Sequence, residues 1–227
     1  MVTSPKRKRE VLATWRASFP HLSRIGGRRL LRVVGPMLLG LEIKGGPPDE
    51  YRIYQVVYPL TRPDVEKCLD FPEVLFETLG EDGRQMFVNY ACSQDLLSSA
   101  IQTVERGALF PFKGDVSLAE LFCGLDTYAD TVIMRAQGSQ ARARSLHFRC
   151  ICSIYLERRE VTQSLLARIC VEKEGWDMDR FEAMFGSFDF WFDNLSFLAE
   201  SPSKLHQIVE RNLASNKLIH LPRNSLI

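Results

Sequence analysis

Two apolar runs on either side of a turn-forming hexapeptide constrain the fold of this chain more than any other feature. The hexapeptide GGPPDE (residues 45–50) concentrates glycine and proline, which set the backbone angles of tight turns. The second run, YRIYQVVY (residues 51–58), is rich in β-branched and aromatic residues, which pack well on a pleated surface. Residues 30–58 are therefore predicted to form two strands joined by a turn.

Further strands are predicted later in the chain. The segment RQMFVNYA (residues 84–91) has the composition of a third strand. Residues 146–156 follow a polar, basic loop (residues 138–145) and have apolar side chains at every second position, which is the period of a strand. The alternating residues are Leu146, Phe148, Cys150, Cys152, Ile154 and Leu156. We therefore expect a strand here, with a second face that is also mostly apolar.

Helical periodicity accounts for most of the remaining chain. Ser93 has the chemistry of a helix cap, and the apolar residues between it and Gly107 repeat at helical spacing. The same reasoning predicts helices over residues 10–19, 93–106, 115–125, 161–171, 179–200 and 201–214, with short helical pieces within residues 62–79. The last two of the long helices form a C-terminal helix pair.

These elements predict an α+β fold. We expect a single mixed domain over residues 10–227, with a small, mainly antiparallel sheet and several helices, preceded by a basic, flexible tail at residues 1–9. A chain of 227 residues is long enough to bury a substantial core.

The charge of the chain is balanced overall but not along its length. Twenty-nine lysine and arginine residues oppose 28 aspartate and glutamate residues, so no global field favours nucleic acid or a membrane. Residues 1–32 nevertheless contain nine basic residues and one acidic residue, an excess of +8 that leaves about −7 on the remainder. Such asymmetry is typical of an interaction arm or of a partner with the opposite charge.

The cysteine pattern and the apolar runs predict a cytoplasmic protein. Six cysteines lie mostly in apolar surroundings without a CxxC pair, so we expect reduced, buried thiols. The basic segment MVTSPKRKRE (residues 1–10) has no apolar run behind it, as a secretory signal would. The longest apolar stretch (residues 30–43) is interrupted by Arg32 and Pro36, and no membrane partner is therefore expected.

The common catalytic and ligand-binding motifs are missing from the sequence. The four histidines lie far apart and have no zinc-site spacing with the cysteines. There is no glycine-rich phosphate loop and no GxSxG motif, and we expect Ser187 to lie inside a helix. We therefore predict no metal, no cofactor and no catalytic residue, which argues weakly against an enzyme because many active sites have no linear motif.

One group of basic residues keeps a nucleic-acid function open as an alternative. Contacts from lysine and arginine to phosphates would make such binding salt-dependent. The candidate residues are Lys6, Arg7, Lys8, Arg9, Arg142 and Arg144. A metal-dependent nuclease is a further possibility, since Glu42 and Lys44 resemble one half of such a site, but Asp49 follows them where it usually precedes them.

The stretch FEAMFGSFDFWFDNLSFLAE (residues 181–200) combines many aromatic side chains with acidic ones. On a helical wheel, its apolar residues form one wide stripe, as a core-facing helix requires. The stripe consists of Phe181, Met184, Phe185, Phe188, Trp191, Phe192 and Leu195. Phe190 and Phe197 fall on the opposite side, beside Asp193 and Asn194. Either another element covers that side, or it is a small apolar patch with an acidic rim.

The leading hypothesis is a cytosolic protein-binding module. We expect it to engage a protein partner through Phe190, Asp193, Asn194 and Phe197, and the acidic residues around them favour a basic one. An immunity-type neutraliser of a basic toxin, or an accessory subunit, would have this profile. The sequence makes no prediction of oligomeric state.

Overall fold

A mainly antiparallel sheet forms the centre of this α+β fold. The computed structural model describes residues 3–80 and 83–227. Within them the strands are β1 (Ser23–Ile25), β2 (Arg29–Val34), β3 (Met37–Gly45), β4 (Glu50–Pro59), β5 (Val74–Glu77), β6 (Val88–Asn89) and β7 (Arg223–Asn224). Their order is β1-β2-β3-β4-β5, with β6 paired to β4 and β7 paired parallel to β2. The predicted hairpin is confirmed, because β3 and β4 pair along their whole length around the turn.

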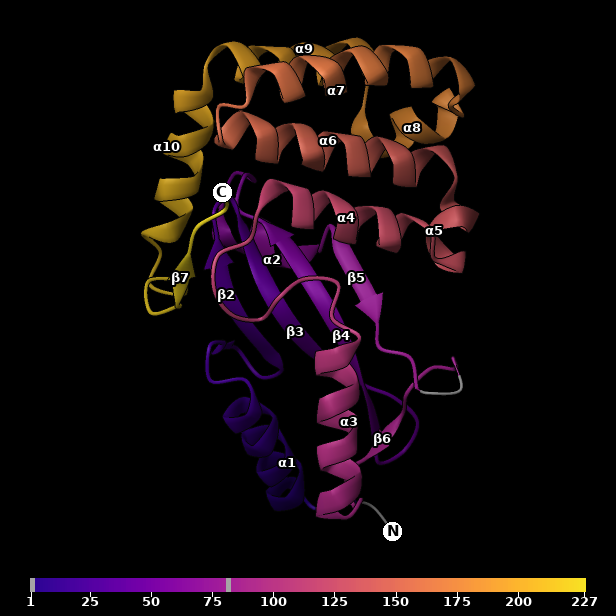
Figure 1. Ribbon diagram of the computed structural model, residues 1–227, viewed down its shortest axis with the longest axis vertical. Coiled ribbons are helices and arrows are strands. Elements are labelled where there is room, and N and C mark those ends of the chain that lie inside the picture. Colours follow the sequence, from indigo (N-terminus) through magenta and orange to yellow (C-terminus); the bar gives the residue numbers. More distant parts are fainter. Residues whose placement is uncertain (1–2, 81–82) are drawn as a thin grey trace.

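Helices cover both faces of this sheet and lie at both of its ends (Figure 1). They are α1 (Pro5–Ser18), α2 (Val65–Asp70), α3 (Gln94–Arg106), α4 (Leu118–Ala129), α5 (Val132–Gln137), α6 (Ser139–Tyr155), α7 (Arg159–Glu172), α8 (Met178–Phe185), α9 (Phe188–Glu200) and α10 (Pro202–Leu213). Figure 1 shows α4, α6 and α7 stacked in successive layers at one end of the sheet, with α9 beside α7 in the outermost layer. The helices α1 and α3 lie at the other end. No helix in the described part of the chain is long and apolar enough to span a membrane.

The two faces of the sheet belong to two separate hydrophobic cores. Successive side chains of a strand point to opposite faces. On β3, Leu39 and Leu41 pack with residues of α1, α3 and α4, whereas Leu38 packs with residues of α2 and α10. Glycine is required at position 40, between Leu39 and Leu41, because a Cβ atom there would lie 2.0 Å from the carbonyl oxygen of Leu30 on the neighbouring strand. The sheet therefore needs helices on both sides, and the chain supplies them.

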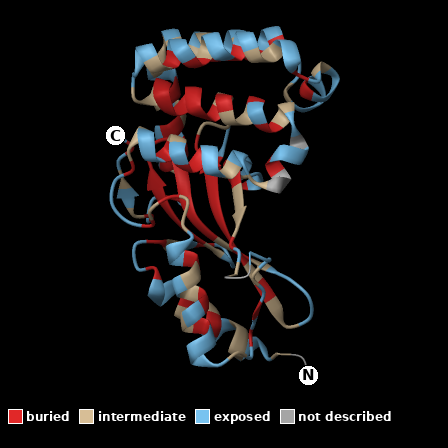
Figure 2. Ribbon diagram, turned by 45° about the vertical axis from the view of Figure 1, so that its right-hand side comes forward, coloured by how far each residue is buried: buried red, intermediate tan, exposed pale blue. Residues whose placement is uncertain are grey.

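A third core lies inside the stacked helices and does not involve the sheet. It is built from α6, α7, α8, α9 and the start of α10, with Trp176, Phe181 and Trp191 among its largest members. Figure 2 shows the pattern that results: the strands are buried along most of their length, and the outer helices are exposed on the side that faces away from the core. The outermost helices therefore present one complete face to solvent.

The strand predicted over residues 146–156 is wrong, because these residues belong to α6. The basic loop predicted at residues 138–145 is also largely part of this helix. The cause is the central position of α6, which contacts α4, α7, α8, α9 and α10. Both the apolar residues and those between them, such as Arg149 and Ser153, are buried. A helix buried on nearly all sides has no polar face and so lacks a clear 3.6-residue period.

The single helix predicted over residues 179–200 consists of two helices, α8 and α9. Gly186 ends α8 with a φ of 77°, a left-handed conformation that glycine adopts without steric cost. Ser187 is therefore not inside a helix but directly before α9. Met184, which was expected in the core, is 49 % exposed on α8.

The predicted tail covers residues 1–9, of which residues 1 and 2 lie outside the described part of the chain. Its basic residues lie in the first turns of α1. The side chain of Ser4 accepts a hydrogen bond from the backbone N–H of Arg7, and Pro5 starts the helix. Further along α1, Trp15 Nε1 donates a buried hydrogen bond of 2.9 Å to the hydroxyl of Tyr51 on β4. This contact attaches α1 to the sheet, so its basic residues are carried on a docked helix.

Candidate functional site

The outer side of α9 carries the residues predicted to bind a partner. Phe190 and Phe197 are 75 % and 51 % exposed, and Asp193 and Asn194 between them are exposed as well. Residues three, four and seven positions apart lie on the same side of a helix. These four residues, named here the α9 stripe, therefore form one continuous surface. Of the two alternatives for this side, the exposed patch is correct.

The opposite side of α9 is fixed by aromatic packing. The rings of Trp191 and Phe181 meet nearly at right angles, at 82°, with their centroids 5.2 Å apart. Phe188 packs against Trp191 at 5.7 Å, and Lys173 Nζ lies 4.3 Å from the centroid of the Phe188 ring. Edge-to-face and offset contacts of this kind add to the stabilisation that comes from burial alone. The rotation of α9 about its axis is therefore set by its core side, which holds the α9 stripe outward.

The surroundings of the α9 stripe are acidic. Residues 177–200 contain six carboxylate side chains and one basic side chain, Arg180, which gives this segment a net charge of −5. All six carboxylate residues are exposed, and Asp189 and Glu200 lie at the two ends of α9. Phe190 and Phe197 therefore lie in a negative field.

The basic residues of α1 are partly engaged within the protein. Arg7 Nε donates to the carbonyl oxygen of Tyr90 at 2.9 Å, and Arg7 Nη2 donates to that of Cys92 at 2.8 Å. Lys8 Nζ lies 5.1 Å from the centroid of the Tyr90 ring. The two further candidates on this helix are exposed: Lys6 and Arg9. Arg7 in particular joins α1 to the segment before α3, which is a structural role.

The other two predicted phosphate-binding arginines lie far from α1 and differ from each other. Arg144 donates to the carbonyl oxygen of Pro72 at 2.8 Å, pairs with Glu73 at 3.5 Å and lies over the ring of Phe71. Arg142 is exposed and lines a cleft. Both belong to α6, whereas α1 lies at the opposite end of the molecule (Figure 1). The structure therefore does not bring the six basic residues together.

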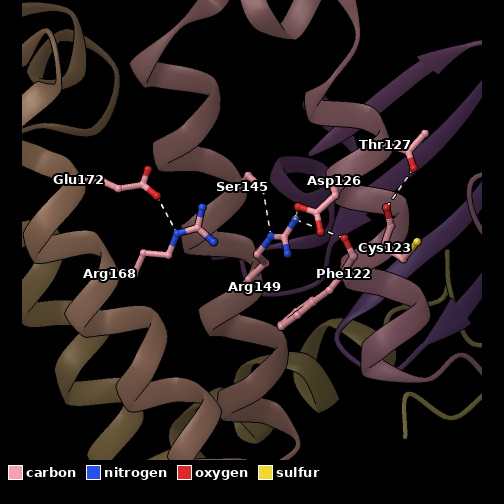
Figure 3. Close-up of polar contacts among 8 residues, drawn as sticks. All are labelled: Phe122, Cys123, Asp126, Thr127, Ser145, Arg149, Arg168 and Glu172. Atoms are coloured by element: carbon pink, nitrogen blue, oxygen red, sulfur yellow. Dashed lines mark hydrogen bonds and ion pairs between the residues drawn. The ribbon is translucent and has the colours of Figure 1, made fainter.

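A cleft lies between α4, α5, α6 and α7. It has a volume of about 960 Å³. Figure 3 shows its central contact, in which Arg149 of α6 reaches α4: one Nη2 atom donates to Asp126 Oδ1 at 2.6 Å and to the carbonyl oxygen of Phe122 at 3.3 Å. Arg149 Nε also donates to Ser145 Oγ at 3.3 Å. Because most of α6 was predicted as a loop and a strand, this cleft between helices was not expected.

The charges that line this cleft largely cancel one another. Arg149 pairs with Asp126, Arg168 pairs with Glu172 at 2.6 Å, and the third pair, at 3.8 Å, is Arg135 with Asp130. Arg142 adds one further positive charge to the lining. The Arg149–Asp126 pair joins α6 to α4, whereas the Arg168–Glu172 pair lies within α7. Paired charges of this kind leave little net field for a ligand. We therefore assign the Arg149 contact a structural role between α4 and α6.

The residues of the hypothetical nuclease motif do not converge. Glu42 pairs with Arg29 at 3.3 Å and with Lys44 at 3.7 Å, whereas Asp49 accepts a hydrogen bond of 2.7 Å from the backbone N–H of Thr3. Among the residues that the structure describes, no three His, Cys, Asp or Glu side chains cluster in a way that could hold a metal ion. A metal-dependent mechanism at Glu42 therefore gains no support from the geometry.

Comparisons with known proteins give no match at any level. No family model matches the sequence, no curated protein matches it, and no solved structure matches the fold. The functional inferences below therefore rest on the surface chemistry of this chain.

Proposed function

We propose that this protein is a protein-binding module of the cytoplasm that docks a basic partner on the α9 stripe. An immunity-type neutraliser of a basic toxin, or an accessory subunit, is the kind of protein that works in this way. The observation that carries the proposal is the exposure of Phe190 and Phe197, at 75 % and 51 %, on an otherwise polar helix face. The six free cysteines support a reducing compartment.

The spacing of the two rings suits a segment of a protein partner. Seven residues of α-helix rise about 10 Å, so a side chain of the partner can pack between Phe190 and Phe197. Aromatic side chains at the centre of an interface often contribute most of the binding free energy, while the polar residues around them exclude water. Asp193 and Asn194 lie between the rings and can accept hydrogen bonds from the partner.

The charge of the surroundings selects the partner. A net charge of −5 over residues 177–200 attracts a basic segment and accelerates its association at low salt. A second copy of this chain would bring the same acidic segment to the interface, and like charges that meet there oppose binding. We therefore propose a basic segment of a different protein, with at least one apolar side chain, as the occupant.

A displayed library of random peptides tests this proposal without a known partner. Peptides selected on the wild-type protein should be enriched in lysine, arginine and apolar residues, and their binding should weaken as salt is raised. In the double variant Phe190→Ser/Phe197→Ser, binding should fall at least about tenfold, because each exposed ring is a candidate hot spot. The matched control is Leu96→Ser on α3, which changes another exposed apolar side chain, 64 % accessible, and should leave binding unchanged.

Two results would contradict the proposal. One is the selection of peptides without a positive charge. The other is undiminished binding of the selected peptides to the Phe190→Ser/Phe197→Ser variant. Light scattering tests whether a second copy of this chain occupies the α9 stripe instead. A wild-type dimer that becomes a monomer in the Phe190→Ser/Phe197→Ser variant would identify that second copy as the ligand.

A further inference from the structure

A second concave surface, separate from α9, is lined by basic residues with little acidic compensation. It has a volume of about 640 Å³ and lies between the β1–β2 turn and the segment that follows α10. Its basic residues, named here the basic pocket, are Arg24, Arg28, Arg29, Lys217 and His220. Glu42 is the single acidic residue in this lining among the described residues. At neutral pH the lining thus carries four positive charges and one negative charge, and Glu66, outside the lining, pairs with Lys217.

The pocket is formed by contacts between segments far apart in the sequence. The ring Nε2 of His220 lies 3.4 Å from the carbonyl oxygen of Arg24, which holds the segment after α10 next to the turn. Lys217 is attached to α2 by a short ion pair with Glu66. Ile25 and Leu69, both only 8 % exposed, provide an apolar floor. The lining is therefore shaped by the fold rather than by one loose loop.

The positive charge in the pocket is only partly neutralised inside the protein. The carboxylate of Glu42 already accepts a hydrogen bond of 2.8 Å from the hydroxyl of Tyr58 and pairs with Arg29. Arg24 Nε donates to the carbonyl oxygen of Gly26 at 2.7 Å, which orients its guanidinium group. For Arg24 and Arg28 no carboxylate partner is present in the described parts of the chain. In the cleft around Arg149, by contrast, three of the four arginines in the lining have carboxylate partners.

We propose that the basic pocket binds the phosphate groups of a phosphorylated ligand of about nucleotide size. The planar guanidinium group donates paired hydrogen bonds to phosphate oxygens, and two arginines without a carboxylate partner can each bind one phosphate group of a diphosphate. A volume of about 640 Å³ lies within the range of small-molecule sites, and the apolar floor can contact the organic part of the ligand. The absence of side chains at Gly26 and Gly27 leaves the turn open for entry.

Calorimetric titration of the whole chain with sodium pyrophosphate tests this inference. We expect saturable binding with one site per chain, weakening as salt is raised. In the variant Arg24→Gln/Arg28→Gln, binding should weaken at least about tenfold, because each charged hydrogen bond contributes substantially. The matched control is Lys6→Gln/Arg16→Gln, which removes the same charge from exposed positions on α1 and should change binding by less than about twofold. Lys217→Gln serves as an independent pocket variant and should also weaken binding.

A parallel titration with single-stranded oligothymidylate separates the two sources of phosphate. Tighter binding of the oligonucleotide than of pyrophosphate, lost in the pocket variants, would assign the phosphate groups to a nucleic-acid backbone. Tighter binding of pyrophosphate or of a nucleoside diphosphate would assign them to a free nucleotide. The inference is overturned if no phosphate compound binds saturably, or if the pocket variants and the α1 control lose binding equally. The absence of phosphate binding, or an equal loss in both sets of variants, leaves the proposal for the α9 stripe unaffected, because no residue of α9 lines the pocket.

Discussion

Arg32 Nη1 donates a hydrogen bond of 2.7 Å to Oδ1 of Asn224, although the two residues lie 192 positions apart in the sequence. The same guanidinium group donates to the carbonyl oxygens of Gly114 and, at 2.7 Å, of Pro111. Arg32 has no exposed surface, and burial lowers the pKa of its guanidinium group, which nearby Asp115 partly offsets. One side chain thus joins β2, the loop before α4 and β7.

We predict that Arg32→Met destabilises the protein by about 3 kcal/mol, since it removes three hydrogen bonds of a buried guanidinium group and leaves three partly buried acceptor groups without that donor. Asn224→Ala removes one of these acceptors and should cost about 1–2 kcal/mol. Urea unfolding of the two variants measures both values. A loss below about 1 kcal/mol for Arg32→Met would show that water replaces the guanidinium group.

The two sides of α9 should respond differently to substitution. Phe188→Ala removes a ring that is only 7 % exposed and should cost about 3–5 kcal/mol through the cavity it leaves. Phe190→Ser/Phe197→Ser should change the free energy of unfolding by less than about 1 kcal/mol, because exposed positions contribute little to folding. Urea unfolding compares the variants under one condition. Equal destabilisation by both changes would mean that α9 is buried on both sides.

The six cysteines should fall into distinct reactivity classes. All are free; Cys123 and Cys170 are exposed, whereas Cys150 and Cys152 are buried. Burial raises the pKa of the Cys150 thiol to about 12, so it has almost no thiolate at neutral pH. A thiol reagent should therefore modify Cys123 and Cys170 rapidly in the native protein and all six cysteines in denaturant. A count below five in denaturant would contradict unpaired thiols.

His147 should make the protein less stable in mild acid. Its Nδ1 atom is buried without a hydrogen-bond partner in the described structure, and its ring packs against Trp191 at 5.6 Å. Burial lowers the pKa of His147; Glu73 opposes this shift and Arg62 adds to it. The unfolded chain then binds a proton at a higher pH than the folded chain, so stability falls as the pH drops through about 6.5.

Urea unfolding at pH 7.5 and pH 5 measures this effect. The variant His147→Phe should show a smaller loss of stability between the two pH values than the wild-type protein. His21→Phe, at an exposed position, is the matched control and should keep the wild-type difference. An identical pH dependence in His147→Phe would assign the acid sensitivity to other groups.

The sequence predicted correctly those helices and strands that depend on residues close together in the chain. The helix predicted from Ser93 is α3, and the Ser93 side chain accepts a hydrogen bond from the N–H of Leu96 as its cap. The two long strands β3 and β4 follow the two apolar runs on either side of the turn. The α+β class follows from these elements, because each signal requires only residues within about one turn or one hairpin.

The sequence did not reveal elements that depend on distant partners. The strand β5 (Val74–Glu77) lies in a segment expected to be helical, because its pairing with β4 outweighs local preference. The basic pocket was missed for the same reason: Arg24 and Lys217 show no common pattern along the chain. The α9 stripe was visible as two phenylalanines off the apolar face, but only the arrangement of the helices determined that they are exposed.

The pairing of β7 with β2 has a consequence for how the protein is made. Val33 pairs with Arg223, so the Val33–Val34 end of β2, beyond the residues that pair with β1, gains its second neighbour only when residues 223–224 have left the ribosome. The bridge between Val116 and Leu226 joins the same late segment to the residues before α4. Contacts between such distant segments form late and slow the folding of a chain. Until then Arg32 lacks Asn224 and the backbone at the Val33–Val34 end of β2 is unpaired on that side, a period in which a nascent chain can pair wrongly with another.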